Sequence, residues 1–286
     1  MIMIVVGILG ISASAIFVRF SAAPSAVTAA WRLLWTALLM TPVVLTKKQV
    51  QQEMRGLDKR TLLLSCVSGL FLAVHFAVWF ESLKHTSVAS STTIVCTEVI
   101  WVCMGYCLFL KGKLSPKALL AIAVTLGGSM LIAWSDSSSG GGHLYGDLLA
   151  LAAAVAVAVY TLIGRVVRER VSTTVYTYLV YSTCGAVLLG LCLAQGHSLL
   201  GYGISAVVVG LLLAVFSTIL GHSIFSWCLK YFSPAFVSAS KLCEPFVASA
   251  IAALLVQELP KVLQIVGGVI VVAGVFLYSR EERKTV

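Results

Sequence analysis

Apolar runs of about twenty residues follow one another along almost the whole chain, and only short polar links separate them. A helix of about 20 apolar residues spans the hydrocarbon core of a bilayer, whereas a soluble domain has shorter, periodic apolar stretches. Of the 286 residues, 59% are hydrophobic and 11% are charged, against roughly 45–50% and 25% in soluble domains. This composition excludes a soluble enzyme and leaves no room for a soluble domain.

Charge clusters and Gly or Pro residues divide the chain into ten apolar segments, which predict an all-α integral membrane protein with ten transmembrane helices. The segments are Ile2–Phe20, Pro24–Leu45, Thr61–Leu83, Ser87–Leu110, Pro116–Trp134, Tyr145–Val167, Thr174–Leu193, Tyr202–Leu229, Pro234–Val256 and Pro260–Tyr278. The start is similar to a secretory signal, but no basic residue precedes the apolar run, so we expect an uncleaved first helix. The polar stretch Lys47–Arg60 is expected to be a cytoplasmic linker or a surface helix.

The basic residues predict the orientation. If the N terminus is cytoplasmic, fifteen of the 20 Lys and Arg residues fall in cytoplasmic segments, three in outer segments and two inside spans. An excess of Lys and Arg in short loops marks the cytoplasmic side. We therefore expect a multi-pass protein of the cell (inner) membrane with both termini cytoplasmic, and we attribute the net charge of +9 to orientation rather than to nucleic-acid binding.

The two halves of the chain resemble each other at an offset of about 146 residues. The matching pairs are 83–87 with 229–233, Glu98 with Glu244, Gly128 with Gly274, and His75 with His222. Five spans per half make the second half enter the membrane from the opposite side, so the repeats are inverted, as in secondary transporters with a site near the midplane. The expected units are a five-helix repeat at 1–134, an extracytoplasmic linker at 135–144, a second repeat at 145–279 and a cytoplasmic tail at 280–286.

Four short segments resemble the EamA family of the drug/metabolite transporter superfamily. Residues 29–34 (AAWRLL) are similar to the arginine-bearing second helix of an EamA unit, and residues 83–89 (LKHTSVA) to the start of its fourth helix. Residues 243–247 (CEPFV) and 256–260 (VQELP) are similar to the proline element and to the acidic boundary before the last helix. The first half departs from the family where Val99, and not proline, follows Glu98. The resemblance implies ten helices and the export, sometimes import, of small metabolites such as amino acids.

Four charged residues lie well inside predicted spans, namely Arg32, Glu98, Lys241 and Glu244. Each costs about 2.5–3.5 kcal/mol at a helix centre on insertion scales, so each must contact protein or water. One interpretation is a neutral network, with Lys241 paired to Glu244 three residues along one helix and Arg32 paired to Glu98 across helices. The other is a binding site near the repeat axis, in which Glu98 is the first candidate proton carrier because no basic residue lies within four positions of it.

Histidine and tryptophan residues stand near these charges in the sequence. His75 and His222, at corresponding positions, either relay protons or pack against a neighbouring carbonyl. Trp79 follows His75 by four residues and Trp101 follows Glu98 by three, and both either pack or form an aromatic wall that attracts an ammonium group. Such a wall, together with basic residues that suit a carboxylate, weakly favours a zwitterionic substrate.

The sequence therefore predicts a secondary active transporter of a small polar or zwitterionic, amino-acid-like metabolite, working by alternating access as a proton-coupled exporter. Alternatives are an importer or facilitator of an organic cation or metabolite, a membrane partner that does not transport, and an intramembrane enzyme, for which no HExxH, GxGD or GxSxG motif is present. The eight cysteines read as small apolar residues, although Cys96, Cys103 and Cys107 share a helical face that could hold a soft metal. We expect no cofactor, no metal and no need for an oligomer, since one chain holds both repeats.

Overall fold

The computed structural model describes residues 2–86, 88–136, 144–256 and 261–282. All regular elements within these residues are helices, which confirms the all-α prediction for this part of the chain. The expected linker at 135–144, the tail at 280–286 and the family segment at 256–260 lie largely outside the described residues.

Each predicted segment corresponds to one helix or to consecutive helices. In the first half these are α1 (Ile2–Ser12), α2 (Ser14–Arg19), α3 (Ser25–Thr46), α4 (Lys48–Arg55), α5 (Lys59–His85), α6 (Val88–Cys96), α7 (Glu98–Phe109) and α8 (Pro116–Asp136). In the second half they are α9 (Leu144–Arg168), α10 (Thr173–Ala194), α11 (Gly203–Leu212), the π-helix η1 (Leu213–His222), α12 (Ser223–Cys228), α13 (Pro234–Lys241), α14 (Glu244–Val256) and α15 (Val262–Glu282). The polar stretch 47–60 contains the short helix α4.

Eight helical stretches among the described residues are long and apolar enough to cross a membrane, and a shorter apolar helix covers Pro116–Ile132. These stretches include α1 with α2, α6 with α7, and α11 with η1 and α12. The segment of α13 and α14 is not among these stretches, so the count of ten spans stays a prediction.

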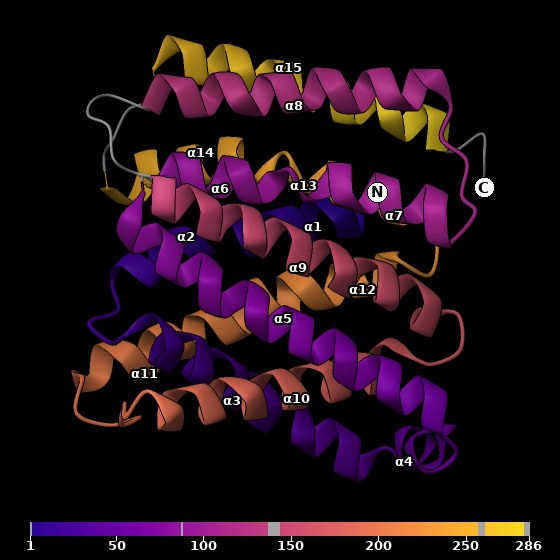
Figure 1. Ribbon diagram of the computed structural model, residues 1–286, viewed down its shortest axis with the longest axis vertical. Coiled ribbons are helices and arrows are strands. Elements are labelled where there is room, and N and C mark those ends of the chain that lie inside the picture. Colours follow the sequence, from indigo (N-terminus) through magenta and orange to yellow (C-terminus); the bar gives the residue numbers. More distant parts are fainter. Residues whose placement is uncertain (1, 87, 137–143, 257–260, 283–286) are drawn as a thin grey trace.

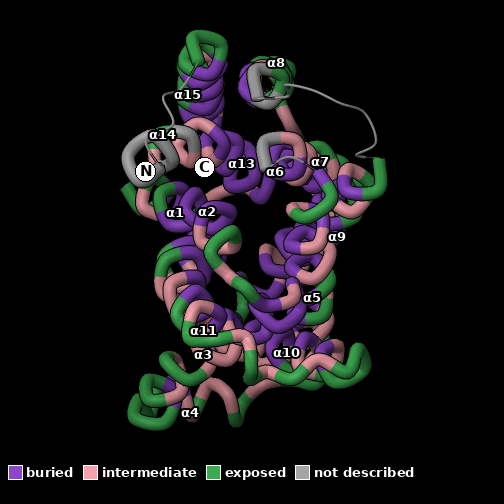
Figure 2. The backbone as a smooth tube through the Cα atoms, turned by 90° about the vertical axis from the view of Figure 1, so that its left-hand side faces the viewer, coloured by how far each residue is buried: buried purple, intermediate pink, exposed green. Residues whose placement is uncertain are grey.

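The long helices run roughly along one direction (Figure 1). The pair α8 and α15 forms one edge of the bundle, α3 and α10 pack together at the opposite edge, and α5 packs on α9 between them. Seen from the side, α1, α2 and α11 form one flank and α5 and α9 the other (Figure 2). Large apolar side chains such as Leu63, Leu120 and Val269 are exposed on the outside, as expected of a surface that contacts lipid.

Glycines allow close helix contacts, among them Gly10 and Gly267. A Cβ on Gly10 would lie 2.7 Å from the carbonyl oxygen of Phe216 in η1. In the α8–α15 pair, Gly128 and Gly267 face each other, and a Cβ on either would lie within 2.8 Å of the other's carbonyl oxygen. Backbone-to-backbone packing of this kind is the usual use of small residues in membrane helices.

The basic residues that were predicted to be cytoplasmic lie at one end of the bundle, on the right of Figure 1, in the described residues 47–60, 111–117, 165–170, 230 and 280. The backbone N–H of Ser172 donates to Glu53 and so joins the start of α10 to α4. The Ser233 hydroxyl donates to Glu282 at 2.9 Å and joins α13 to the end of α15. We call this the basic end. Its position on the cytoplasmic side of a membrane stays a prediction.

Candidate functional site

Two helices break inside the bundle, and each break is followed directly by a glutamate. Helix α6 ends at Cys96 and α7 begins at Glu98, while α13 ends at Lys241 and α14 begins at Glu244. In the second half, Pro245 follows the break and cannot donate the N–H that would continue the helix. In the first half, the Thr97 hydroxyl and N–H both bond to the carbonyl of Ile94 and close a tight turn. The two glutamates that the repeat aligns therefore occupy equivalent positions at helix N-termini, where a negative charge is favoured.

Lys241 forms an ion pair with Glu98 and not with Glu244. The Lys241 Nζ lies 2.8 Å from Glu98 Oε1, and both side chains are buried. The expected pairing of Lys241 with Glu244 is wrong, because the break between α13 and α14 removes the continuous helical turn that would have brought these two side chains together. The ion pair instead joins the first half of the chain to the second.

Arg32 is fully buried, and its expected pairing with Glu98 is also wrong. Its Nε donates to the Thr218 hydroxyl at 2.7 Å, its Nη1 donates to the Ser14 hydroxyl at 3.3 Å, and the guanidinium lies 4.1 Å from the centre of the Phe76 ring. Neutral hydroxyls and an aromatic ring thus replace the carboxylate. Nη2 has no hydrogen-bond partner among the described residues, so one donor of this cation is left unused.

A cavity of about 40 Å³ lies between the two halves. Six of the eight predicted site residues line it: Glu98, Glu244, Lys241, His75, His222 and Trp79. Ser14 and Thr92 line it as well, so Arg32 reaches the cavity wall through its bond to Ser14. A volume of this size holds a few water molecules and no larger metabolite.

The two histidines meet in this cavity. The Nδ1–H of His75 donates to the carbonyl of Ala153 at 3.0 Å, and its ring stacks on Trp79 with 5.7 Å between ring centres. The rings of His75 and His222 lie edge to face at 6.4 Å. The carbonyl bond satisfies one nitrogen of His75, as in the packing interpretation, while the position of both rings on the cavity wall agrees with a site.

Trp101 does not line the cavity, although we expected it on the same helix face as Glu98. Three residues along an α-helix correspond to a rise of about 4.5 Å and fall about 60° short of a full turn. Because Glu98 is the first residue of α7, this rise carries Trp101 past the cavity toward the basic end. The pairing of Trp101 with a substrate thus has no support in the arrangement of the described residues.

Sequence reasoning missed the π-helix η1 and the residue that it presents to Arg32. The Thr218 hydroxyl bonds back to the carbonyl of Leu213, five residues earlier, and the Ser223 hydroxyl bonds back to the carbonyl of Thr218. Such π-turns are rare and are often found at functional sites. The only sequence signal was the polar pair Ser217-Thr218 within an apolar run. Among the described residues, no group of three His, Cys, Asp or Glu is arranged to hold a metal.

The sequence profile of the EamA-like transporter family matches residues 1–134 and again 144–280. The chain belongs to this family. The two matches coincide with the two halves that contribute Glu98 and Glu244 to the cavity. No curated relative matches the sequence. A solved crystal structure shares the fold with a TM-score of 0.81 at 16% sequence identity, over 99% of this chain and 97% of that one.

Membership of the EamA-like family identifies the chain as a multi-pass membrane transporter within the drug/metabolite transporter superfamily. A transporter of this family acts on a small molecule and works in a lipid bilayer.

Proposed function

We propose that the protein is a secondary transporter that moves a small amine-bearing, amino-acid-like metabolite by alternating access around the cavity, as a proton-coupled exporter. Two inverted five-helix repeats, with ten spans and both termini in the cytoplasm, form its framework. The observation that carries the proposal is the equivalent placement of Glu98 and Glu244 after helix breaks on either side of one cavity. Broken helices with their N-termini near the midplane are how transporters present polar groups to a ligand.

The two glutamates have different roles in this proposal. Glu98 is bound to Lys241, so the charges of this pair cancel and the pair holds the two halves together. Glu244 forms no ion pair among the described residues, and it is the carboxylate that remains for a proton or for the ammonium group of a substrate. The role of exchangeable acid therefore passes from Glu98, which the sequence favoured, to Glu244.

Unused hydrogen-bond donors near the cavity suit the carboxylate end of the same substrate. Trp79 Nε1 and the Thr92 hydroxyl are buried without a partner among the described residues, as is Arg32 Nη2. A buried donor without a partner is costly, and a ligand that accepts its hydrogen bond relieves that cost. A zwitterion with its ammonium on Glu244 and its carboxylate on these donors satisfies both sets of groups.

The alternative of an organic cation has one observation in its favour. Lys241, the basic residue on the cavity wall, is already neutralised by Glu98, so the remaining charge on the wall is the carboxylate of Glu244. A substrate that carries an amine and no carboxylate would fit this charge as well.

Transport into proteoliposomes tests the proposal and separates the two substrate classes. We expect an imposed pH gradient to drive accumulation of amino acids, while amines of the same side chain that lack the carboxylate move more weakly. Glu244→Gln should abolish the dependence on the pH gradient. The matched control is Glu81→Gln, because Glu81 is a half-exposed helical glutamate that contacts Lys84 and His85 outside the cavity. Unchanged pH-driven transport by Glu244→Gln would refute its role, and stronger transport of the amines would favour the organic cation.

A further inference from the structure

Three tyrosines bond to three serines in neighbouring turns of α5, α9, α10 and α12. The Tyr160 hydroxyl lies 2.9 Å from the hydroxyl of Ser226, and the Tyr181 hydroxyl lies 3.0 Å from that of Ser223. The third bond, of 2.7 Å, joins Tyr176 to Ser68. The first two bonds attach α12 to α9 and to α10, and the third attaches α10 to α5. We call these six residues the tyrosine–serine layer.

The layer lies between the cavity and the basic end. In α9, Val157 lines the cavity, Tyr160 follows it by one turn, and the helix then reaches the basic end at Arg168. After η1, His222 lines the cavity and Ser226 follows it by one turn, just before the end of α12. In both α9 and α12, therefore, the first helical turn beyond the cavity toward the basic end carries a residue of the layer.

We propose that the tyrosine–serine layer is the gate that closes the cavity toward the basic end, and that α12 is its moving element. This inference rests on the proposed alternating access and not on the identity of the substrate. On the side of the layer that faces the basic end, two arginines of α9 bind the end of α12. Arg168 Nε donates to the carbonyl of Ser226 at 3.1 Å, and Arg165 Nη1 donates to the carbonyl of Leu229 at 2.6 Å. The six-residue helix α12 is thus held by polar side chains of α9 and α10 as well as by its buried apolar residues Ile224, Phe225 and Cys228.

The chemistry of these contacts suits a gate better than a helix–helix contact that stays closed. A hydroxyl can exchange its bond to another hydroxyl for a bond to water, so the net cost of opening each bond is small. The α8–α15 seam is different, since there the glycine backbones themselves are in contact and separation would lose packing with no replacement. The π-helix η1 lies directly before α12 and supplies a weakened turn about which α12 can swing.

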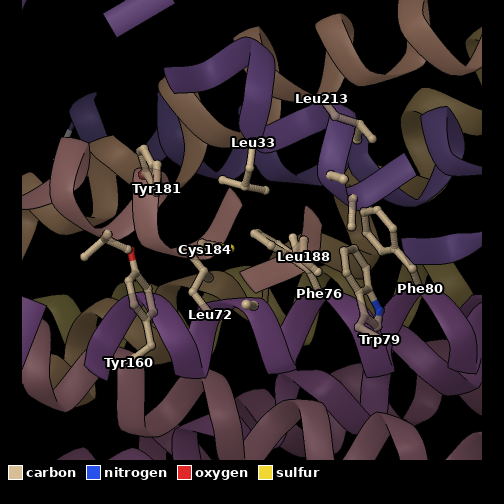
Figure 3. Close-up of a cluster of buried hydrophobic side chains, with 14 of the residues drawn as sticks. Leu33, Leu72, Phe76, Trp79, Phe80, Tyr160, Tyr181, Cys184, Leu188 and Leu213 are labelled. Carbon is tan, nitrogen blue, oxygen red and sulfur yellow. The ribbon is translucent and has the colours of Figure 1, made fainter. Parts of the chain in front are cut away.

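A native cysteine reports on this gate. Cys184 is fully buried in α10, one turn beyond Tyr181 on the side away from the basic end. Figure 3 shows Cys184 close to Tyr181, Tyr160 and Leu72, with Phe76 farther along the cluster. Under this proposal, a thiol reagent from the basic end reaches the buried Cys184 only after the layer has opened.

The test is thiol labelling of the full chain in membrane vesicles with the basic end outward. A membrane-impermeant maleimide is added, and the modified cysteine is identified by peptide mass spectrometry. Tyr160→Phe and Ser226→Ala each remove one bond of the layer and keep nearly the same volume. We expect each to raise the labelling rate of Cys184 about fivefold, the change in open population that corresponds to one net hydrogen bond.

Ser65→Ala is the matched control, because the only hydrogen bond of the buried Ser65 hydroxyl within the described residues goes to the carbonyl of Thr61 in its own helix. Faster labelling in the two layer variants, from the basic end and not in the control, supports the gate. Equal labelling in all variants overturns it. So does faster labelling from both sides of the membrane or in the control as well, since that pattern indicates general loosening. Because no substrate is added, a wrong substrate class in the transport assay leaves this result unaffected.

Discussion

Replacing Lys241 with methionine tests the central ion pair, because methionine keeps much of the length of the side chain and removes its charge. The pair is 2.8 Å long, and the side chains of Lys241 and Glu98 are only 10% and 4% exposed. At an effective dielectric constant of about 20, two unit charges at this distance attract each other by about 6 kcal/mol before desolvation is counted. Removing one partner leaves the other charge buried and alone, which costs about 3–5 kcal/mol of stability.

A set of double variants identifies the partner of Lys241. Unfolding of the purified protein in lipid nanodiscs or mixed micelles should show Lys241→Met destabilised by about 3–5 kcal/mol, on the order of 10 °C in melting temperature. Adding Glu98→Gln removes the stranded carboxylate and should restore most of the loss. Adding Glu244→Gln instead should restore little. Recovery in the Glu244 combination and not in the Glu98 combination would show that our assignment of the pair is wrong.

Two further predictions concern packing and a helix end. Gly10→Ala should destabilise the protein by about 1–3 kcal/mol, because its Cβ would meet backbone atoms of η1. The control Gly190→Ala, with nothing within 4 Å of the new Cβ, should be neutral or slightly stabilising. Equal melting temperatures of the two variants would contradict the close contact of α1 with η1. Asp58 caps α5, and the hydrogen bonds from Thr61 lower the pKa of its carboxyl group. The contribution of this cap to stability is therefore present above the ordinary pKa of about 3.9. It is lost as the pH falls through the lower pKa of the folded state. The difference in melting temperature between Asp58→Ala and the native protein should accordingly be present at pH 6 and shrink in acid, and a difference that grows in acid would refute the capping role.

The sequence predicted the elements of this fold well because a bilayer imposes a simple rule on them. Every expected apolar segment begins and ends within a few residues of a helix, since a span needs about 20 apolar residues and polar residues must mark its ends. The π-helix left no such signal, since its residues are as apolar as those of an α-helix.

The sequence predicted which charged residues line the cavity but not which of them pair with each other. Glu98, Glu244 and Lys241 drew attention because charge is costly inside a span, and all three line the cavity. The partner of Lys241 could not be derived, because the choice between Glu98 and Glu244 depends on where α13 breaks and on how close α7 lies. Likewise, nothing in the sequence indicates that Arg32 is held by the hydroxyls of Thr218 and Ser14 in place of a carboxylate.

The division of roles between the glutamates follows from a constraint on any site that must release its ligand. A carboxylate fixed in a buried ion pair cannot exchange its partner cheaply, since the stranded charge costs several kcal/mol. The Lys241–Glu98 pair crosses from one half to the other, so it favours the closed arrangement in which the two halves meet. Glu244 carries no such partner among the described residues, and in the proposed function it is the group that binds and releases a proton or an ammonium group. Two glutamates at equivalent positions of two repeats thus acquire different chemistry from a single lysine, Lys241, which has the apolar Val95 at the corresponding position of the first half.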